Sequence, residues 1–99
     1  MLCALSVRKL KPGSYEDFRR AWEPEEWPEG FTRAYHVRNI EDENQVISFG
    51  VYDGTLDQLN EIRDRQGEAD RQQRMAEFVE STELDGMFEV LDEVVPPAQ

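Results

Sequence analysis

The stretch FTRAYHVRNIEDENQVISFGVYDGTLDQ, residues 31–58, holds two strand-like runs joined by a polar turn and followed by a helix start. Residues 31–40 and 45–52 are rich in β-branched and aromatic side chains, which favour strands. The polar residues 41–44 separate the two runs. This pattern predicts a β-hairpin.

Downstream, a helix is expected from Thr55 to about Ser81. Thr55 and Gln58 have the spacing of a capping box, and apolar residues then recur at helical intervals. Gly67 interrupts the helix and predicts a kink, because glycine costs about 1 kcal/mol relative to alanine there. The arginine and acidic residues that alternate along this helix favour a solvated, ion-paired face. The last strand is expected at 84–95, before two prolines.

Upstream, residues 2–10 are predicted to form the first strand, and Lys11-Pro12-Gly13 to form a turn. A helix is expected after the N-cap candidate Ser14. It should end by Glu23, because a proline follows. Residues 25–30 are expected to form a loop. The resulting order, strand–helix–strand twice, predicts an α+β, ferredoxin-like βαββαβ fold: a four-stranded antiparallel sheet with two helices on one face, as a single domain over residues 1–99.

The composition argues against several classes of partner. The 22 acidic residues outnumber the 11 Lys and Arg residues, for a net charge of −11. Nucleic-acid backbones and anionic membrane surfaces repel such a chain, so neither is an expected partner. No signal peptide or membrane-spanning run is recognised. The single cysteine, Cys3, excludes an internal disulfide and fits a reducing cytoplasm. One histidine and scattered acids predict no metal site.

Both faces of the expected sheet are apolar. Ile47, Phe49 and Val51 alternate with Val46 and Tyr52. The same holds in the last strand, where Phe88, Val90 and Val94 alternate with Met87, Leu91 and Val95. In the second strand, one side is predicted to carry Phe31, Tyr35 and Val37. Two helices cover only one face of a four-stranded sheet, and monomers rarely expose large apolar patches. We therefore expect a homodimer that pairs the uncovered faces.

The chain resembles the dimeric α/β-barrel proteins of the antibiotic biosynthesis monooxygenase-like superfamily. The resemblance lies in the entry to the first helix at residues 11–18, in the hairpin and in the closing strand at residues 88–91. It implies a ligand cleft between the helices and the sheet. Members include cofactor-independent oxygenases, haem-degrading enzymes, isomerases and proteins of no known activity. Haem degraders of this class carry an axial histidine on the second helix, and residues 55–81 contain none, which argues against haem.

Two neighbouring residues are the candidates for catalysis. His36, the only histidine, titrates near neutrality and is a candidate general base. Tyr35 is a candidate proton donor. Each also has a purely structural interpretation, because strand histidines often pack or form hydrogen bonds and tyrosine is a common strand former.

Trp22, Trp27 and Arg33 are the candidates for substrate binding. The tryptophans flank the end of the first helix and are predicted either to wall a pocket for a planar ligand or to cover the core. Arg33, like Arg8, is able to anchor a carboxylate or phenolate. Ion pairing with one of the many acidic side chains is the alternative for both arginines.

Two functions from different classes remain open. The first is an enzyme of the cofactor-independent monooxygenase-like type, acting on a small organic substrate, aromatic or polyketide-like, without a cofactor. The second is a non-catalytic small-molecule-binding or structural homodimer. A cleft filled by its own side chains would be the signature of the second.

Overall fold

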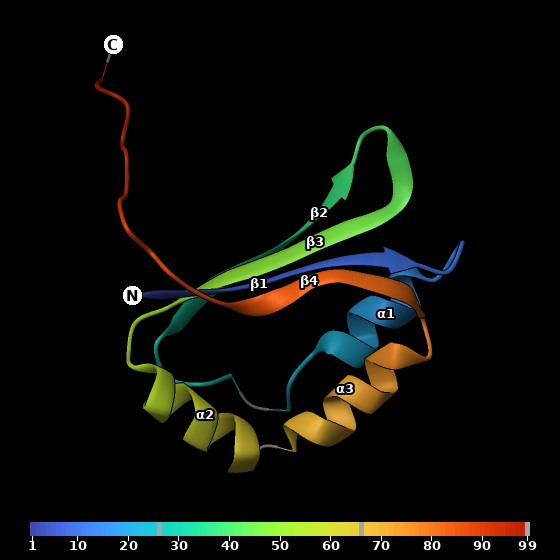
Figure 1. Cartoon of the computed structure of the whole chain (residues 1–99), viewed down its shortest axis with the longest axis horizontal. Helices are drawn as coiled ribbons and strands as arrows, with labels where there is room; N and C mark the ends of the chain where they lie inside the picture. The colour runs from blue at the N-terminus through green and yellow to red at the C-terminus, as the bar shows by residue number, and fades with distance from the viewer. Residues whose placement is uncertain (26, 66, 99) are drawn as a thin grey trace.

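Four antiparallel strands and three helices make up the fold (Figure 1). A computed structural model describes residues 1–25, 27–65 and 67–98. The expected loop residue Glu26 and the expected helix residue Gln66 lie outside this set. The strands are β1 (Leu2–Leu10), β2 (Phe31–Asn39), β3 (Asp42–Tyr52) and β4 (Val79–Glu89), in the spatial order β2-β3-β1-β4. The helices are α1 (Tyr15–Trp22), α2 (Leu56–Arg65) and α3 (Glu68–Ala76), and all three lie beneath one face of the sheet. The ferredoxin-like fold expected from the sequence is confirmed.

The core lies where α1 and α3 meet the middle of the sheet. Leu10 of β1, Phe18 of α1, Val46 of β3 and Met75 of α3 form one buried cluster. Burying a side chain such as Phe18 contributes about 2–3 kcal/mol. This packing fixes α1 and α3 below one end of β1 and β3, whereas α2 lies below the other end, so a space remains between them.

The long helix expected from Thr55 to Ser81 is two helices. Gly67, at the N-terminus of α3, has a φ of 70°, which places it in the left-handed region. Glycine enters this region without the steric cost that other residues meet, so the kink expected at Gly67 is a complete break. The cap at the start of α2 forms as predicted: Gln58 N–H donates to Thr55 Oγ1 at 3.2 Å, and Thr55 N–H donates to Gln58 Oε1 at 2.9 Å.

The prediction for the last strand was wrong at both ends. β4 begins at Val79, which pairs with Leu10, and ends at Glu89, which pairs with Leu2. A strand needs a neighbouring backbone, and β1 offers none beyond Leu2 except one final bond from Val90 N–H to the Met1 carbonyl. Residues 90–95 therefore leave the sheet, although four of the six are apolar.

The hairpin also departs from its prediction. Its turn consists of Ile40 and Glu41, and β3 starts at Asp42 rather than at residue 45. The β2–β3 register shifts between Phe31 and Arg33, a bulge that puts one extra residue into β2. Phe31 consequently lies against Tyr52 on the helix-covered face, and not on the side of Tyr35 and Val37.

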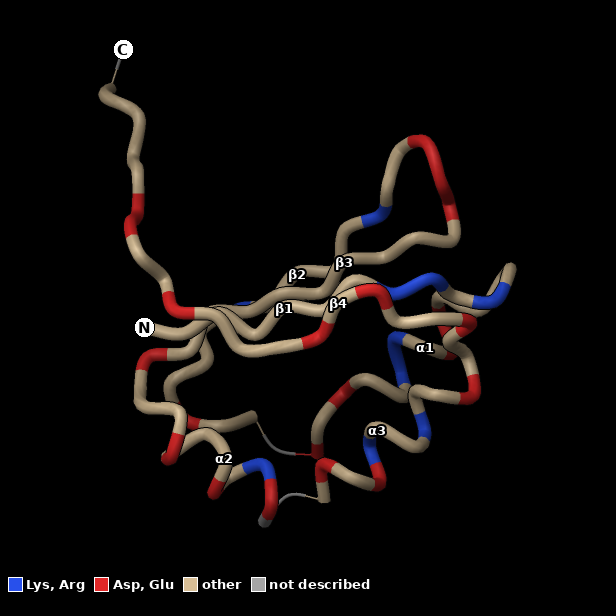
Figure 2. Tube along the Cα trace, viewed as in Figure 1, with Lys and Arg blue, Asp and Glu red and all other residues tan. Residues whose placement is uncertain are grey.

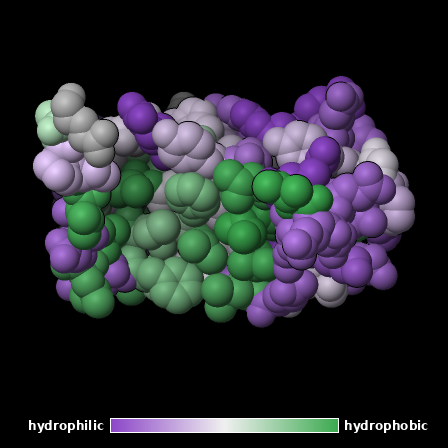
Figure 3. Space-filling model, turned by 90° about the horizontal axis from the view of Figure 1, so that it is seen from above, coloured by the Kyte–Doolittle hydropathy of each residue, from purple (hydrophilic) through white to green (hydrophobic). Residues whose placement is uncertain are grey.

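The other face of the sheet carries no helix. Seen from that side, it shows a continuous hydrophobic zone bordered by hydrophilic residues (Figure 3). Among its large side chains, Tyr35, Val37, Leu84 and Phe88 are exposed. We call this surface the open face.

Acidic residues are distributed along the hairpin turn, the C-terminal segment and the helices (Figure 2). Among the residues that the structure describes, no helix has the length and apolar character needed to cross a membrane.

Gly30 provides a stability test for the segment that leads into β2. Its φ is 108°, and a Cβ there would lie 2.7 Å from the Asp53 carbonyl oxygen and 2.8 Å from the Tyr52 ring. Gly13 also has a positive φ, 74°, but a Cβ there meets nothing within 4 Å. We expect Gly13→Ala to cost about 1–2 kcal/mol and Gly30→Ala to cost about 1–3 kcal/mol more. Urea unfolding of the two variants measures the difference, and equal losses would contradict the prediction.

Candidate functional site

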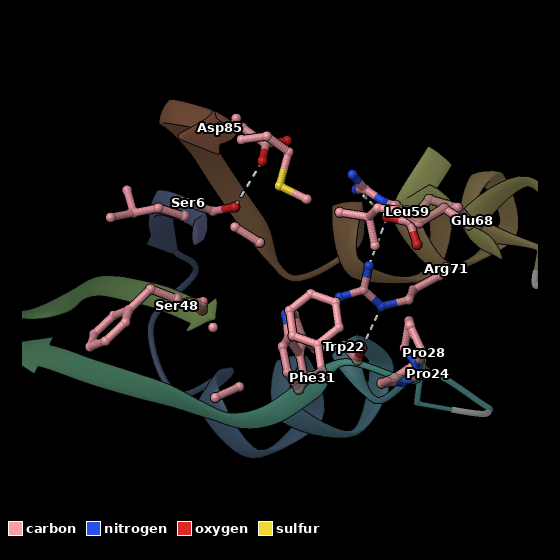
Figure 4. A pocket seen from close by; sticks show the side chains of 18 of the residues that line it. Ser6, Trp22, Pro24, Pro28, Phe31, Ser48, Leu59, Glu68, Arg71 and Asp85 are labelled. Carbon is pink, nitrogen blue, oxygen red and sulfur yellow. Dashed lines mark hydrogen bonds and ion pairs between the residues drawn. The ribbon is translucent and has the colours of Figure 1, made fainter. Parts of the chain in front are cut away.

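A cavity of about 230 Å³ lies between the helix-covered face of the sheet and the helices (Figure 4). β1, β3 and β4 form its floor, and α2 and α3 border it. One wall is apolar and consists of Trp22, Pro24, Trp27, Pro28, Phe31 and Leu59. The volume suits a ligand of about two fused rings, because it lies below the roughly 300–1,000 Å³ of pockets for larger ligands.

The aromatic wall depends on the loop between α1 and β2. The Trp22 and Trp27 rings are tilted against each other with centroids 5.4 Å apart, and the Trp27 and Phe31 centroids are 6.3 Å apart. Trp27 Nε1 donates to Glu23 Oε1 at 3.3 Å, which orients an indole that is 46% exposed. The structure thus places both tryptophans on the cavity wall. Phe31 joins them because of the β2 bulge.

A row of polar residues crosses the helix-covered face from edge to edge. Strand register aligns His36 of β2, Ser48 of β3, Ser6 of β1 and Asp85 of β4. His36 Nδ1 lies 2.7 Å from Ser48 Oγ, and Ser6 Oγ donates to Asp85 Oδ1 at 2.8 Å (Figure 4). Both serines are buried, and they face each other directly across β1 and β3. We call these four residues the polar row; Ser48, Ser6 and Asp85 line the cavity.

His36 lies behind Ser48 rather than on the cavity wall. The rings of Tyr15, Phe18 and Trp22 surround its imidazole edge-on, and the nearest ring, Trp22, has its centroid 4.4 Å away. Burial lowers the pKa of His36 to about 4, and the positive charges of nearby arginines act in the same direction. The imidazole is therefore neutral at pH 7. Its Nε2 is buried without a hydrogen-bond partner among the described residues.

Tyr35 and Arg33 lie on the open face, away from the cavity. The Tyr35 ring stacks on Phe49 with centroids 5.3 Å apart and an interplanar angle of 28°. Arg33 Nη1 donates to the Tyr35 hydroxyl at 3.3 Å. Because side chains alternate along a strand, His36 and Tyr35 point to opposite faces of the sheet. Of the two catalytic candidates, only His36 lies on the helix-covered face, where it contacts Ser48 and Trp22 of the cavity lining.

The α3 side of the cavity carries an ion-pair cluster. Glu68 Oε1 accepts from Arg63 at 2.9 Å, from Arg71 at 2.8 Å and from Gln72 at 2.8 Å. Arg71 Nε also donates to the Trp22 carbonyl at 2.5 Å (Figure 4). Burial raises the pKa of Glu68, but these hydrogen bonds and the arginine charges outweigh it and lower the pKa overall. We expected a solvated face here, but the Arg71 side chain is only 14% exposed.

The ion-pair cluster has a signal in the sequence beyond the solvated face predicted there. Glu68, Arg71, Gln72 and Met75 follow the i, i+3, i+4, i+7 spacing of one helix face. Because Met75 belongs to the core, its neighbours on that face also point inward. Ser6 and Ser48 had a weaker signal, as polar residues at inward positions of otherwise apolar strands. Among the described residues, no group of three or more His, Cys, Asp or Glu side chains is arranged to hold a metal ion.

The buried His36 predicts a pH-dependent stability. Its folded-state pKa of about 4 lies below the usual 6.5, so the unfolded chain binds the proton more readily between these values. Stability should therefore fall as the pH drops from about 6.5 to 4, by up to about 3 kcal/mol from this residue.

The His36→Gln variant is the control, because it keeps every other titrating group. Urea unfolding at pH 7 and pH 4 should show a larger loss for the wild type than for His36→Gln. Identical losses would mean that His36 titrates normally in the folded state.

The sequence matches no protein-family model and no curated protein. Solved structures do match the fold. SnoaB, a cofactor-independent oxygenase from Streptomyces nogalater, superposes with a TM-score of 0.70 at 14% identity over 97% of both chains. A protein from Chloroflexus aurantiacus, assigned as an antibiotic biosynthesis monooxygenase, gives 0.71 at 9% identity over 96% of this chain and 98% of its own. A protein from Nitrosomonas europaea with the same assignment gives a TM-score of 0.69 at 13% identity, over 93% of this chain and 100% of its own. The chain therefore has the ferredoxin-like fold of the antibiotic biosynthesis monooxygenase-like proteins.

Proposed function

We propose that the protein is a small-molecule enzyme of the cofactor-independent oxygenase type, with a small aromatic substrate bound in the cavity. The observation that carries the proposal is the polar row beneath an aromatic wall: a neutral imidazole lies 2.7 Å from a serine hydroxyl that lines the cavity. The likeness of the fold to SnoaB, a cofactor-independent oxygenase, supports the reaction class. The single thiol, Cys3, fits the cytoplasmic location that we propose.

An oxygenase without a cofactor must take its electrons from the substrate. A CH₂ group next to a carbonyl and an aromatic ring is acidic enough to lose a proton, and the carbanion reduces O₂. Loss of water then leaves a new carbonyl, so that R₂CH₂ and O₂ give R₂C=O and H₂O. Ser48 is placed to pass the proton to His36, because its hydroxyl contacts both the cavity and Nδ1. The aromatic wall excludes water from the carbanion.

The alternative is a non-catalytic binding protein. It is favoured by the low pKa of His36, because an imidazole with a pKa of about 4 is a weak base. A purely structural role is disfavoured by the cavity, which the protein's own side chains leave open.

Oxygen uptake distinguishes an enzyme from a binding protein. We expect 2-tetralone, a two-ring ketone with an acidic CH₂ group, to be oxidised with one O₂ consumed per carbonyl formed, without added metal or reductant. Ser48→Ala and His36→Gln should each slow the reaction by about 10²- to 10⁴-fold, the usual contribution of general base catalysis. The exposed Ser81→Ala is the matched control and should keep the wild-type rate.

If the Ser48→Ala variant turned over at the wild-type rate, the polar row would have no role in the mechanism. Binding of 2-tetralone without oxygen uptake would favour the non-catalytic alternative.

We further propose a homodimer that buries the open face. Its apolar residues would otherwise remain in water, at a cost of about 25 cal/mol for each Å². Val37 is 41% exposed on this face, whereas Ile40 is fully exposed at the hairpin turn. Val37→Asp should therefore yield monomers, and Ile40→Asp should leave the dimer intact. Native mass spectrometry measures both, and a dimeric Val37→Asp protein would argue against this interface.

A further inference from the structure

Arg8 is a buried cation on the helix-covered face of β1. Arg8 is only 5% exposed, and it contributes to the lining of the cavity. The guanidinium carbon lies 5.6 Å from the centroid of the Phe18 ring, so one side of the guanidinium faces the core. Along β1, Arg8 follows Ser6 of the polar row by two residues and therefore points to the same face.

This cation has no counterion in the part of the chain that the structure describes. Its Nη1 is buried and has no hydrogen-bond partner there, and no carboxylate oxygen there lies within 4.0 Å. Burial lowers the pKa of Arg8, and the charge of Asp85 offsets this only in part. A guanidinium nevertheless remains protonated in proteins. A buried, unpaired charge is costly, so proteins rarely keep one without a ligand or partner.

The acidic residues of the cavity are already engaged. Glu68 accepts from Arg63, Arg71 and Gln72, and Asp85 accepts from Ser6. The lining therefore holds three arginines, Arg8, Arg63 and Arg71, against two carboxylates. This small excess of positive charge lies within a chain of net charge −11. The contrast favours a ligand that brings a negative charge of its own.

We propose that Arg8 anchors the carboxylate of an aromatic acid whose rings lie against Trp22 and Phe31. The guanidinium presents paired N–H donors in a plane, which match the two oxygens of a carboxylate. The inference rests on the proposed function in one respect, because both place a small aromatic molecule in this cavity. It adds the substrate class, an aromatic carboxylate, and the residue that selects it.

The first experiment compares 2-naphthoate with 2-naphthamide, which has nearly the same shape but no charge. Quenching of the fluorescence of Trp22 and Trp27, which line the cavity, reports binding there. The wild type should bind 2-naphthoate about 10- to 100-fold more tightly than the amide, as expected for a charge-assisted hydrogen bond. Arg8→Met should abolish this preference while the amide still binds. Arg20→Met is the matched control and should keep the preference, because it removes an exposed arginine that pairs with Asp17 outside the cavity.

The second experiment measures the melting temperature without ligand. Because Arg8 is unpaired, Arg8→Met removes a buried charge and keeps much of the side-chain volume. We expect the melting temperature to rise by about 4–8 °C. A less stable or unfolded Arg8→Met protein would assign Arg8 to the core and overturn the proposal.

The outcomes separate this inference from the proposed function. Equal affinity of the wild type for both probes rejects the anchor and leaves an aromatic cavity. A preference for 2-naphthoate that depends on Arg8, in a protein without oxygen uptake, supports the anchor and rejects the oxygenase. Failure of both probes to bind rejects the anchor and the aromatic cavity together.

Discussion

The fold and the site both depend on how β1 pairs with its two neighbours. β1 lies between β3 and β4, and its register against them decides which residues of separate strands meet. That register aligns Ser6 with Ser48 on one side and with Asp85 on the other. A slip of β1 by one residue would turn Ser6 to the opposite face, away from Ser48 and Asp85, because side chains alternate along a strand. The buried Leu10, held against Phe18 and Met75, opposes such a slip.

Local patterns predicted the elements but not the way in which they combine. The apolar start of residues 2–10 and the turn signal at Lys11-Pro12-Gly13 predicted the bounds of β1, and the capping box at Thr55 predicted the start of α2. β4 could not be bounded in this way, because its end is set by where β1 ends and not by its own apolar residues. The position of Phe31 depends on a bulge that no local pattern indicates. The polar row was invisible for a similar reason, since its four members come from four strands.

The candidate site was therefore predicted only in part. His36, Trp22 and Trp27 stood out by residue type, and all three lie at or beside the cavity. Tyr35 and Arg33 were predicted from the chemistry of a phenol and a guanidinium, and strand alternation places both on the open face. The chemistry of the cavity instead comes from residues that are ordinary one at a time. Ser48 becomes notable only when its burial and its contact with His36 are known. Arg8 is distinguished from Arg33 only by its burial and its missing partner.

The central place of β1 has a consequence for how the protein is made. The ribosome produces β1 before its two partners, which end at residues 52 and 89. The nascent chain therefore holds this apolar strand without β3 until residue 52 is made, and without β4 until residue 89 is made. Strand pairings between such distant residues form slowly, because the intervening chain must first be ordered. An unpaired apolar strand also invites aggregation during that interval. Nascent chains of this fold thus expose an apolar strand for longer than helical proteins of the same length, whose contacts are mostly local.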